Sequence, residues 1–402
     1  MSKDIIISDA RYEETAVEGK ISCSIYGDGL PRELWCSTEL SNSLRLSRNS
    51  LNWAIVALLY PAMFSGRNIF VSGPASKSLI DCLNNDLQSF LLAFNPSLKR
   101  IVIDVREESK EISNQSKLNA TGFSAGIDSF STLARYFYSE TSSPDEKVSA
   151  LSVFNVGAFG DSAEASTRLY ENAKNRLINF SEGKKLIALD LNSNIGDCYL
   201  LGGALECGFQ KTNTLRNVAA ALAFEGAIGT YYISSSFSPD CISTRPSYNI
   251  AYLDPIILPL FSFGVTRFVS SCCGMSRFEK TMQVAALEDA WRYLDVCTQG
   301  EVERMRINMK NCGECLKCCR TLFALEKIGK LEPFAARFEL DKFYRNRNSL
   351  VGKLRKSAAR GNTLDAEVIS NLGIVTQSGL SKFLAWGFAR RFRSRLRRGK
   401  SD

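Results

Sequence analysis

The sequence contains no histidine, and this absence narrows the chemistry that is open to the chain. Without an imidazole there can be no Ser-His-Asp triad, no Cys-His pair and no zinc hydrolase with histidine ligands. Any reaction must therefore depend on electrostatics, carboxylates, lysines, arginines or thiols.

Long apolar runs are missing as well. The longest one covers 54–64 and contains Pro61, whereas a helix that spans a bilayer needs about 20 apolar residues. The start, Met1-Ser-Lys-Asp, is followed by only a short apolar segment, which does not resemble a secretory signal. We therefore expect a cytoplasmic protein.

The bulk composition is that of an ordinary globular protein, with 45% hydrophobic and 23% charged residues in 402. This length suits two domains or one elaborated domain. The net charge of +8 comes mostly from the segment 382–400, so the rest of the chain is close to neutral. The overall charge therefore does not by itself indicate a nucleic-acid-binding protein.

Hydrophobic periodicity predicts an α/β protein. Helices are expected at 51–64, 76–94, 130–137, 164–178 and 214–228, and strands at 5–7, 21–26, 68–71, 100–105, 120–123, 150–156, 186–191, 230–234 and 267–271. From residue 119 the alternation predicts a parallel sheet with helices on both faces, which binds ligands at the carboxyl ends of its strands.

A candidate phosphate loop lies between an expected strand and an expected helix. It reads Ser124-Ala125-Gly126-Ile127-Asp128-Ser129. Small residues let the backbone approach a phosphate, and the helix start offers N–H groups and the positive end of its dipole. Asp128 is placed to orient the loop or to hold Mg²⁺. An ordinary turn with a Ser or Asp cap would also fit these residues.

The run 123–133, FSAGIDSFSTL, resembles the SGGxDS signature of the PP-loop ATP pyrophosphatases. Ala125 stands where the first glycine is usual, and alanine costs little there if its φ is negative. The P-loop GKS/T and the dinucleotide-binding GxGxxG do not occur in a fitting context. The resemblance implies that 124–129 bind ATP and that Asp128 takes part in catalysis.

A second resemblance, to the 7-cyano-7-deazaguanine synthases, rests on Arg216 and Asn217. The pair resembles the Arg-Asn pair that starts a helix across the cleft from the PP-loop in that family. It implies that Arg216 neutralises phosphate charge, although a surface arginine is the alternative. Asn155 and Gly157 stand at the end of an expected strand, where the family places backbone groups that contact adenine.

Thirteen cysteines, an odd number without an export signal, argue against a disulfide framework. Cys312, Cys315 and Cys318 form a CxxCxxC motif, and Cys297 has a suitable spacing for a fourth metal ligand. Cys272, Cys273 and Cys319 are alternatives for that fourth position.

An iron–sulfur cluster competes with zinc for these cysteines, but Leu322 stands where a ferredoxin would continue with cysteine. The deazaguanine synthases have a similar arrangement of one upstream cysteine and then CGxCxxC followed by arginine. The resemblance implies that all four thiolates bind a structural zinc ion.

The resemblance covers about 120–330 and leads to four predicted regions. They are an N-terminal mixed α/β domain at 1–115, a PP-loop domain at 116–290, a zinc-binding region at 291–335 and a helical, basic extension at 336–402. The implied activity is ligase-like, as in the pathway to queuosine. ATP and Mg²⁺ would adenylate a carboxylate with release of pyrophosphate, and ammonia or another nitrogen nucleophile would then attack. Lys280 is a third candidate to hold phosphates, and a surface ion pair is the alternative for it.

Two other functions stay open at this point. One is a PP-loop enzyme that modifies tRNA with sulfur or another group, and the other is a nucleotide-binding subunit without catalysis. The apolar and basic residues of 382–400 suit a helix docked on its own domain, a nucleic-acid contact or a segment on an anionic membrane. A homodimer is a further partner that we consider.

Overall fold

The computed structural model describes residues 4–108, 117–159, 163–202, 207–262, 266–299 and 309–373. The chain forms two compact units, Met1–Ser276 and Arg277–Asp402. Most of the polar segment 106–117 and the whole basic segment at 382–400 lie outside the described residues.

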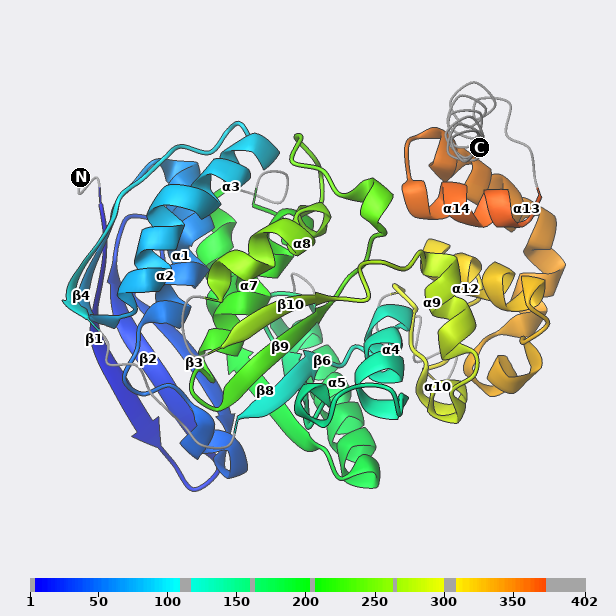
Figure 1. Ribbon diagram of the computed structural model, residues 1–402, viewed down its shortest axis with the longest axis horizontal. Helices are drawn as coiled ribbons and strands as arrows, with labels where there is room; N and C mark the ends of the chain where they lie inside the picture. Colours follow the sequence, from blue (N-terminus) through cyan, green and yellow to red (C-terminus); the bar gives the residue numbers. More distant parts are fainter. Residues whose placement is uncertain are drawn as a thin grey trace, which may run out of the picture. The chain divides into compact units, whose positions relative to one another are not determined.

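The first unit is built on one ten-stranded sheet with the order β10-β9-β6-β7-β8-β3-β2-β1-β4-β5 (Figure 1). The strands are β1 Ile5–Glu14, β2 Glu18–Tyr26, β3 Glu33–Glu39, β4 Ile69–Ala75, β5 Ile103–Glu108, β6 Leu118–Gly122, β7 Ala150–Phe154, β8 Ile187–Ser193, β9 Ile228–Ser234 and β10 Arg267–Ser271. Neighbours are parallel from β10 to β8 and from β1 to β5, and antiparallel between β8 and β1. The predicted α/β class with a mostly parallel sheet is therefore confirmed.

Helices cover both faces of this sheet (Figure 1). The helices are α1 Asn52–Ser65, α2 Lys77–Cys82, α3 Gln88–Phe94, α4 Ile127–Leu133, α5 Ala163–Lys184, α7 Phe209–Leu222 and α8 Asp254–Ile257. On one face Phe130 of α4 packs edge-on against Phe180 of α5, with ring centroids 6.0 Å apart. On the other face α1 packs against α7.

Helix α1 is apolar on all sides, and its side chains from Asn52 to Met63 are buried. A helix of this kind has no face suited to water, so it lies between other elements. No helix in the described part of the chain is both long enough and apolar enough to cross a membrane.

One expected helix is shifted in the structure. The expectation was 214–228, whereas α7 begins at Phe209 and ends at Leu222. The alanine-rich run suggested a longer helix, but Gly226 has a φ of 97° and the chain turns there into β9. Arg216 therefore lies in the middle of α7 and not at its start.

The parallel strands from β10 to β8 join the N-terminal strands where β3 pairs antiparallel with β8. Only Cys36 with Ser193 and Ser37 with Asn192 are paired as strand neighbours. Beyond them, Thr38 Oγ1 donates a hydrogen bond of 2.7 Å to the Asp190 carbonyl, so a side chain continues the pairing. Residues 4–108 and the segment from β6 to β10 thus share one sheet.

The second unit is helical in its described part. It contains α9 Arg277–Val284, α10 Glu288–Tyr293, α12 Leu316–Lys327, the 3-10 helix η9 Glu332–Arg337, α13 Leu340–Ala359 and α14 Thr363–Asn371. The Arg320 guanidinium on α12 binds the buried Asp365 carboxylate of α14 through two contacts of 2.5 and 3.1 Å. This ion pair fastens α12 to α14.

Candidate functional site

The loop 124–129 connects the carboxyl end of β6 to the start of α4. Ala125 has a φ of 56°, in the left-handed region that favours glycine. The condition of a negative φ is thus not met, and alanine is strained where the PP-loop signature has its first glycine. Gly126 then caps α4 with an extended backbone, so the chain turns sharply into the helix.

Side chains of the loop hold this turn. Gly126 donates its N–H to Ser124 Oγ at 3.2 Å, and Ser129 Oγ donates to the Gly126 carbonyl at 3.0 Å. The two hydroxyl oxygens of Ser124 and Ser129 lie 3.5 Å apart. Asp128 is in the first turn of α4, where N–H groups have no acceptor within the helix. The geometry suits an anion at the helix start.

Hydroxyl groups anchor α4 to the neighbouring strands. Thr132 Oγ1 lies 2.9 Å from Ser234 Oγ at the end of β9 and 2.9 Å from Ser271 Oγ at the end of β10. These contacts join three elements at the carboxyl edge of the parallel sheet. Our sequence reasoning missed them because the three residues are far apart in the chain.

Arg216 is buried, and its guanidinium reaches the carboxyl end of β7. It donates to Thr212 Oγ1 at 2.8 Å, to the Val156 carbonyl at 3.1 Å and to the Cys207 carbonyl at 3.0 Å. The Tyr199 ring lies against it, with the centroid 4.0 Å from the central carbon. The surface alternative for this residue is therefore wrong.

Arg216 has no carboxylate partner among the residues that the structure describes. Burial lowers the pKa of this guanidinium from its usual value, yet an arginine stays protonated in proteins. A buried charge that is bound only by neutral groups can attract an anion. Helix periodicity could have identified Thr212, which lies four residues earlier on α7.

Gly157 and Asn155 lie next to this arginine at the end of β7. Gly157 has a φ of 87°, and a Cβ added there would come within 2.6 Å of Arg216 Nη1. Only glycine therefore lets the backbone pass so close to the guanidinium. Asn155 Nδ2 donates to Asn192 Oδ1 on β8 at 2.8 Å. The structure thus brings Asn155, Gly157 and Arg216 together.

Asn217 and Lys280 are the other two residues that the sequence predicted for the site. Asn217 follows Arg216 on α7, and its Nδ2 donates to the Asn213 carbonyl at 2.7 Å. Lys280 lies on α9 in the second unit. Its side chain is buried, so the alternative of a surface ion pair is wrong.

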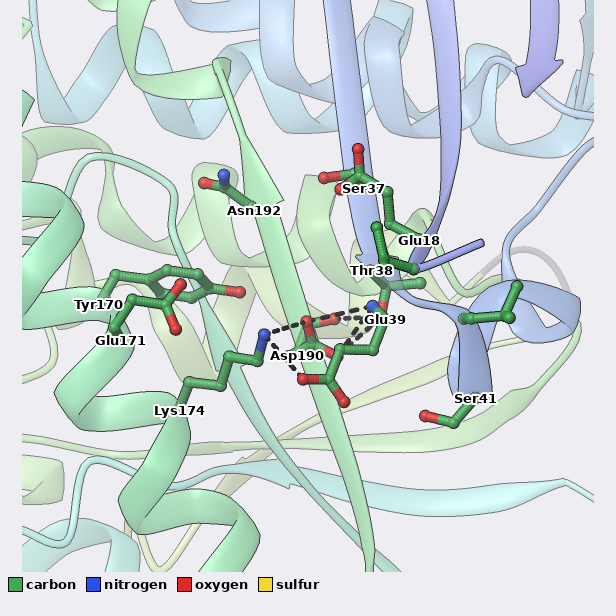
Figure 2. Close-up of a pocket in the computed structure, with 12 residues that line it drawn as sticks. Glu18, Ser37, Thr38, Glu39, Ser41, Tyr170, Glu171, Lys174, Asp190 and Asn192 are labelled. Carbon is green, nitrogen blue, oxygen red and sulfur yellow. Dashed lines mark hydrogen bonds and ion pairs between the residues drawn. The ribbon is translucent and has the colours of Figure 1, made fainter. Parts of the chain in front are cut away.

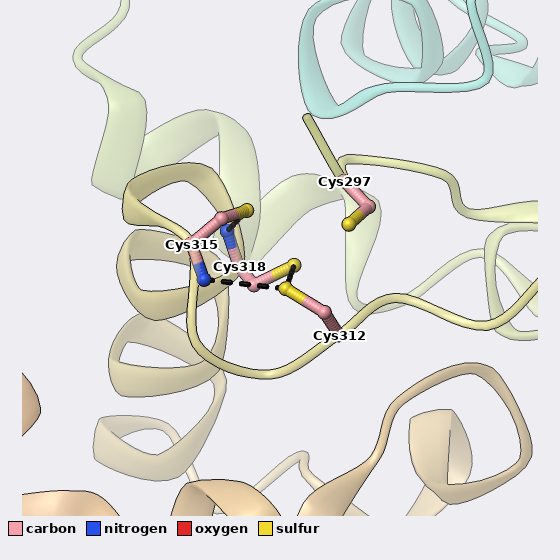
Figure 3. Close-up of side chains that lie close together, drawn as sticks. All are labelled: Cys297, Cys312, Cys315 and Cys318. Atoms are coloured by element: carbon pink, nitrogen blue, oxygen red, sulfur yellow. Dashed lines mark hydrogen bonds between the residues drawn. The ribbon is translucent and has the colours of Figure 1, made fainter. Parts of the chain in front are cut away.

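The four cysteines Cys297, Cys312, Cys315 and Cys318 lie together in the second unit (Figure 3). All four sulfur atoms are within 4.8 Å of one another, and the Sγ atoms of Cys312 and Cys318 are 3.9 Å apart. A tetrahedral zinc site with Zn–S bonds of about 2.3 Å requires sulfurs about 3.8 Å apart. The cluster can therefore hold a metal ion such as zinc.

Local backbone structure shapes this cluster. Cys315 is the residue before α12, and its sulfur accepts the Cys318 N–H at 3.4 Å. Cys312 Sγ accepts the N–H groups of Glu314 at 3.4 Å and Cys315 at 3.3 Å. N–H donors and a helix start both favour thiolates, which are the form that binds metals. At Gly313, with a φ of 76°, a Cβ would lie 2.8 Å from the Glu339 carbonyl.

The thiols share protons when no metal is bound. Hydrogen bonding from the Cys297 thiol lowers the pKa of Cys312 to about 6 and also lowers that of Cys315. Hydrogen bonds with the other cysteines of the cluster raise the pKa of Cys297 and of Cys318. A bound metal ion would displace all these protons.

Asn311 is the residue that our sequence reasoning missed at this cluster. Its Oδ1 accepts the N–H groups of Val296 at 2.8 Å and Cys297 at 3.0 Å. Its Nδ2 donates to the carbonyls of Leu294 and Arg337, each at 3.0 Å. A buried asparagine thus holds the segment of Cys297 beside Cys312. Its position next to Cys312 was the available signal.

No protein-family model matches this sequence, and comparison with curated proteins and with solved structures gives no match.

Proposed function

We propose that this protein is an ATP-dependent ligase that adenylates a substrate carboxylate and passes the activated acyl group to a nitrogen nucleophile. The observation that carries the proposal is the loop 124–129, with its left-handed Ala125, at the carboxyl edge of a parallel sheet. Ligands of such sheets bind at this edge. The resemblance of 123–133 to the PP-loop signature supports ATP as the ligand.

The proposed binding mode uses groups on two neighbouring strands. Phosphates would approach the start of α4, where Ser124 and Ser129 add hydroxyl donors to the backbone N–H groups. Asp128 would hold Mg²⁺, which supplies charge neutralisation at the phosphates. Adenine would lie near Asn155 and Gly157, at the end of the adjacent strand β7.

Arg216 supports an anionic ligand at this edge. Its charge is buried and held by neutral acceptors, with no carboxylate nearby in the described residues. The rigid guanidinium would stabilise negative charge that develops as pyrophosphate leaves.

The reaction needs no histidine. An oxygen of the substrate carboxylate would form a bond to the α-phosphorus of ATP, and the bond from that phosphorus to pyrophosphate would break. The nitrogen nucleophile would then attack the acyl carbon and release AMP. Positioning and charge neutralisation are the main contributions that the chain must make to these steps.

We also propose that Cys297, Cys312, Cys315 and Cys318 bind one zinc ion with a structural role. Four thiolates would fill the tetrahedral coordination and leave no position for substrate. The S–S spacing and the N–H donors at the sulfurs support this assignment. Metal analysis should give about one zinc per chain, whereas iron with a visible charge-transfer band would contradict it.

The ligase proposal is tested by pyrophosphate release from ATP with ammonia and a panel of carboxylates, with 7-carboxy-7-deazaguanine first. Asp128→Asn and Ser124→Ala should each reduce release strongly. Asp145→Asn, an exposed carboxylate in the same unit, is the matched control and should keep full activity. Unchanged turnover in both loop variants would contradict the proposal. ATP binding without pyrophosphate release on any carboxylate would favour a nucleotide-binding subunit.

A further inference from the structure

A pocket lies in the first unit, and none of its lining residues belongs to the loop 124–129. Its volume is about 470 Å³, and it opens where β3 and β8 separate beside α5 (Figure 2). Its lining comes from the starts of β2 and η1 Leu40–Arg45, from the ends of β3 and β8, and from α5. This size is in the range of cavities that bind small molecules.

The lining of this pocket is acidic. It contains four carboxylates, those of Glu18, Glu39, Glu171 and Asp190, and one ammonium group, that of Lys174. Lys174 Nζ lies 2.8 Å from Glu39 and 3.7 Å from Asp190. One positive charge thus faces four negative ones. The excess would repel ATP or another anion.

Glu18 and Glu171 differ from the other two carboxylates because they have no ion-pair partner in the described residues. Asp190, in contrast, accepts from Thr38 Oγ1 at 2.9 Å and from Asn42 Nδ2 at 3.2 Å. Asp190 therefore stabilises the contact between β3 and β8. The negative charge that remains available to a ligand comes mainly from Glu18 and Glu171.

Tyr170 gives independent evidence that something binds here. It is 3% exposed, and its hydroxyl is buried without a hydrogen-bond partner. Figure 2 shows its ring extending from α5, with the oxygen directed toward the strand that carries Asp190. A buried hydroxyl without a partner costs free energy unless a ligand or water pairs with it. Its oxygen can accept an N–H from an ammonium or guanidinium group.

We propose that this pocket binds a small organic cation with two or more ammonium or guanidinium groups, of the polyamine class. Cationic groups would pair with Glu18 and Glu171, and another N–H would reach the Tyr170 oxygen. A divalent metal fits less well, because these carboxylate oxygens do not form a cluster of metal-ligand spacing within the described residues. The inference does not depend on ATP binding.

The probes for calorimetry are putrescine and spermidine, with Mg²⁺ and neutral 1,4-butanediol for comparison. Wild-type protein should bind one spermidine per chain, with saturation, and should not bind the diol. Tyr170→Phe and Glu18→Gln should each weaken binding about tenfold or more, because each loses a hydrogen bond or ion pair to a charged ligand. Glu107→Gln removes an exposed carboxylate on β5 and should leave the affinity unchanged.

The proposal would be overturned by the absence of saturable polyamine binding, by equal weakening in Glu107→Gln and in Glu18→Gln, or by equally tight binding of Mg²⁺. The melting temperature of Tyr170→Phe distinguishes a misfolded variant from a folded variant that has lost binding. That variant deletes a hydroxyl that has no partner, so its stability without ligand should match or exceed that of the wild type. Unchanged affinity in a folded Tyr170→Phe protein would also overturn the proposal.

Discussion

Replacement of Asn311 by alanine should loosen the cysteine cluster while all four cysteines stay in place. The side chain makes four hydrogen bonds, two from backbone N–H groups and two to carbonyls. One of the donors is the N–H of Cys297 itself. Loss of Asn311 therefore releases the segment that brings Cys297 to the other three cysteines.

The expected magnitude follows from these contacts. A net hydrogen bond contributes about 0.5–1.5 kcal/mol, and a buried group left without a partner costs about 1–3 kcal/mol. Because water will partly replace the amide, we expect a loss of about 2–4 kcal/mol in the free energy of unfolding. Asn311→Asp should be intermediate, since a carboxylate can accept both N–H bonds but repels both carbonyls.

The assay combines urea unfolding with the rate of metal transfer to a chromogenic chelator, both on zinc-loaded protein. Asn311→Ala should unfold at lower urea and release zinc faster than wild type. Asn346→Ala, which loses one exposed bond of 2.7 Å to Glu314, is the control and should change stability by less than about 0.5 kcal/mol. Equal stability and equal zinc release in Asn311→Ala and wild type would refute the reasoning.

Three further predictions concern single positions. Ala125→Gly should raise the free energy of unfolding by up to about 1 kcal/mol. The relief of strain at the positive φ outweighs the stabilisation of the unfolded chain by the greater backbone entropy of glycine. A lower melting temperature would contradict this. Burial raises the pKa of Asp254 from 3.8 to about 7, despite a hydrogen bond of 2.6 Å from Thr214. The folded state thus binds the proton more tightly, and the stability from this group is present below about pH 4 and lost as the pH rises through 7. The free energy of unfolding of Asp254→Asn, taken relative to that of the wild type, should therefore be higher at pH 8 than at pH 5. The same difference at both pH values would argue against the raised pKa. Asp365→Ala should cost about 3–5 kcal/mol in urea unfolding, since it leaves Arg320 without its buried partner, and a loss below about 1 kcal/mol would be inconsistent with that ion pair.

Much of the strand and helix order could be predicted from the sequence. Periodicity predicted the helices that became α1 and α5 and nine of the ten strands, because each has its own local apolar pattern. The four cysteines were predicted together because a CxxCxxC spacing already limits where their sulfurs can lie.

The strand β3 was missed. Its sequence, Glu33–Glu39, mixes charged, aromatic and hydroxyl residues, and two of its side chains serve the joint with β8. Thr38 and Asp190 are 152 residues apart, so no local pattern reports their contact. The burial of Arg216 was also not predictable from the sequence, because one of its acceptors, the Val156 carbonyl, is 60 residues away in the chain.

The late pairing of β3 has a consequence for how the chain is made. Strands β1 to β3 can pair as soon as they emerge from the ribosome, but the partner of β3 is synthesised about 150 residues later. At about 5–20 residues per second this interval is roughly 8–30 s. During that time the edge of β3 has unpaired N–H and C=O groups that can pair with a strand of another chain. The nascent chain thus depends on timely arrival of β8, and delays in translation between these strands should favour aggregation.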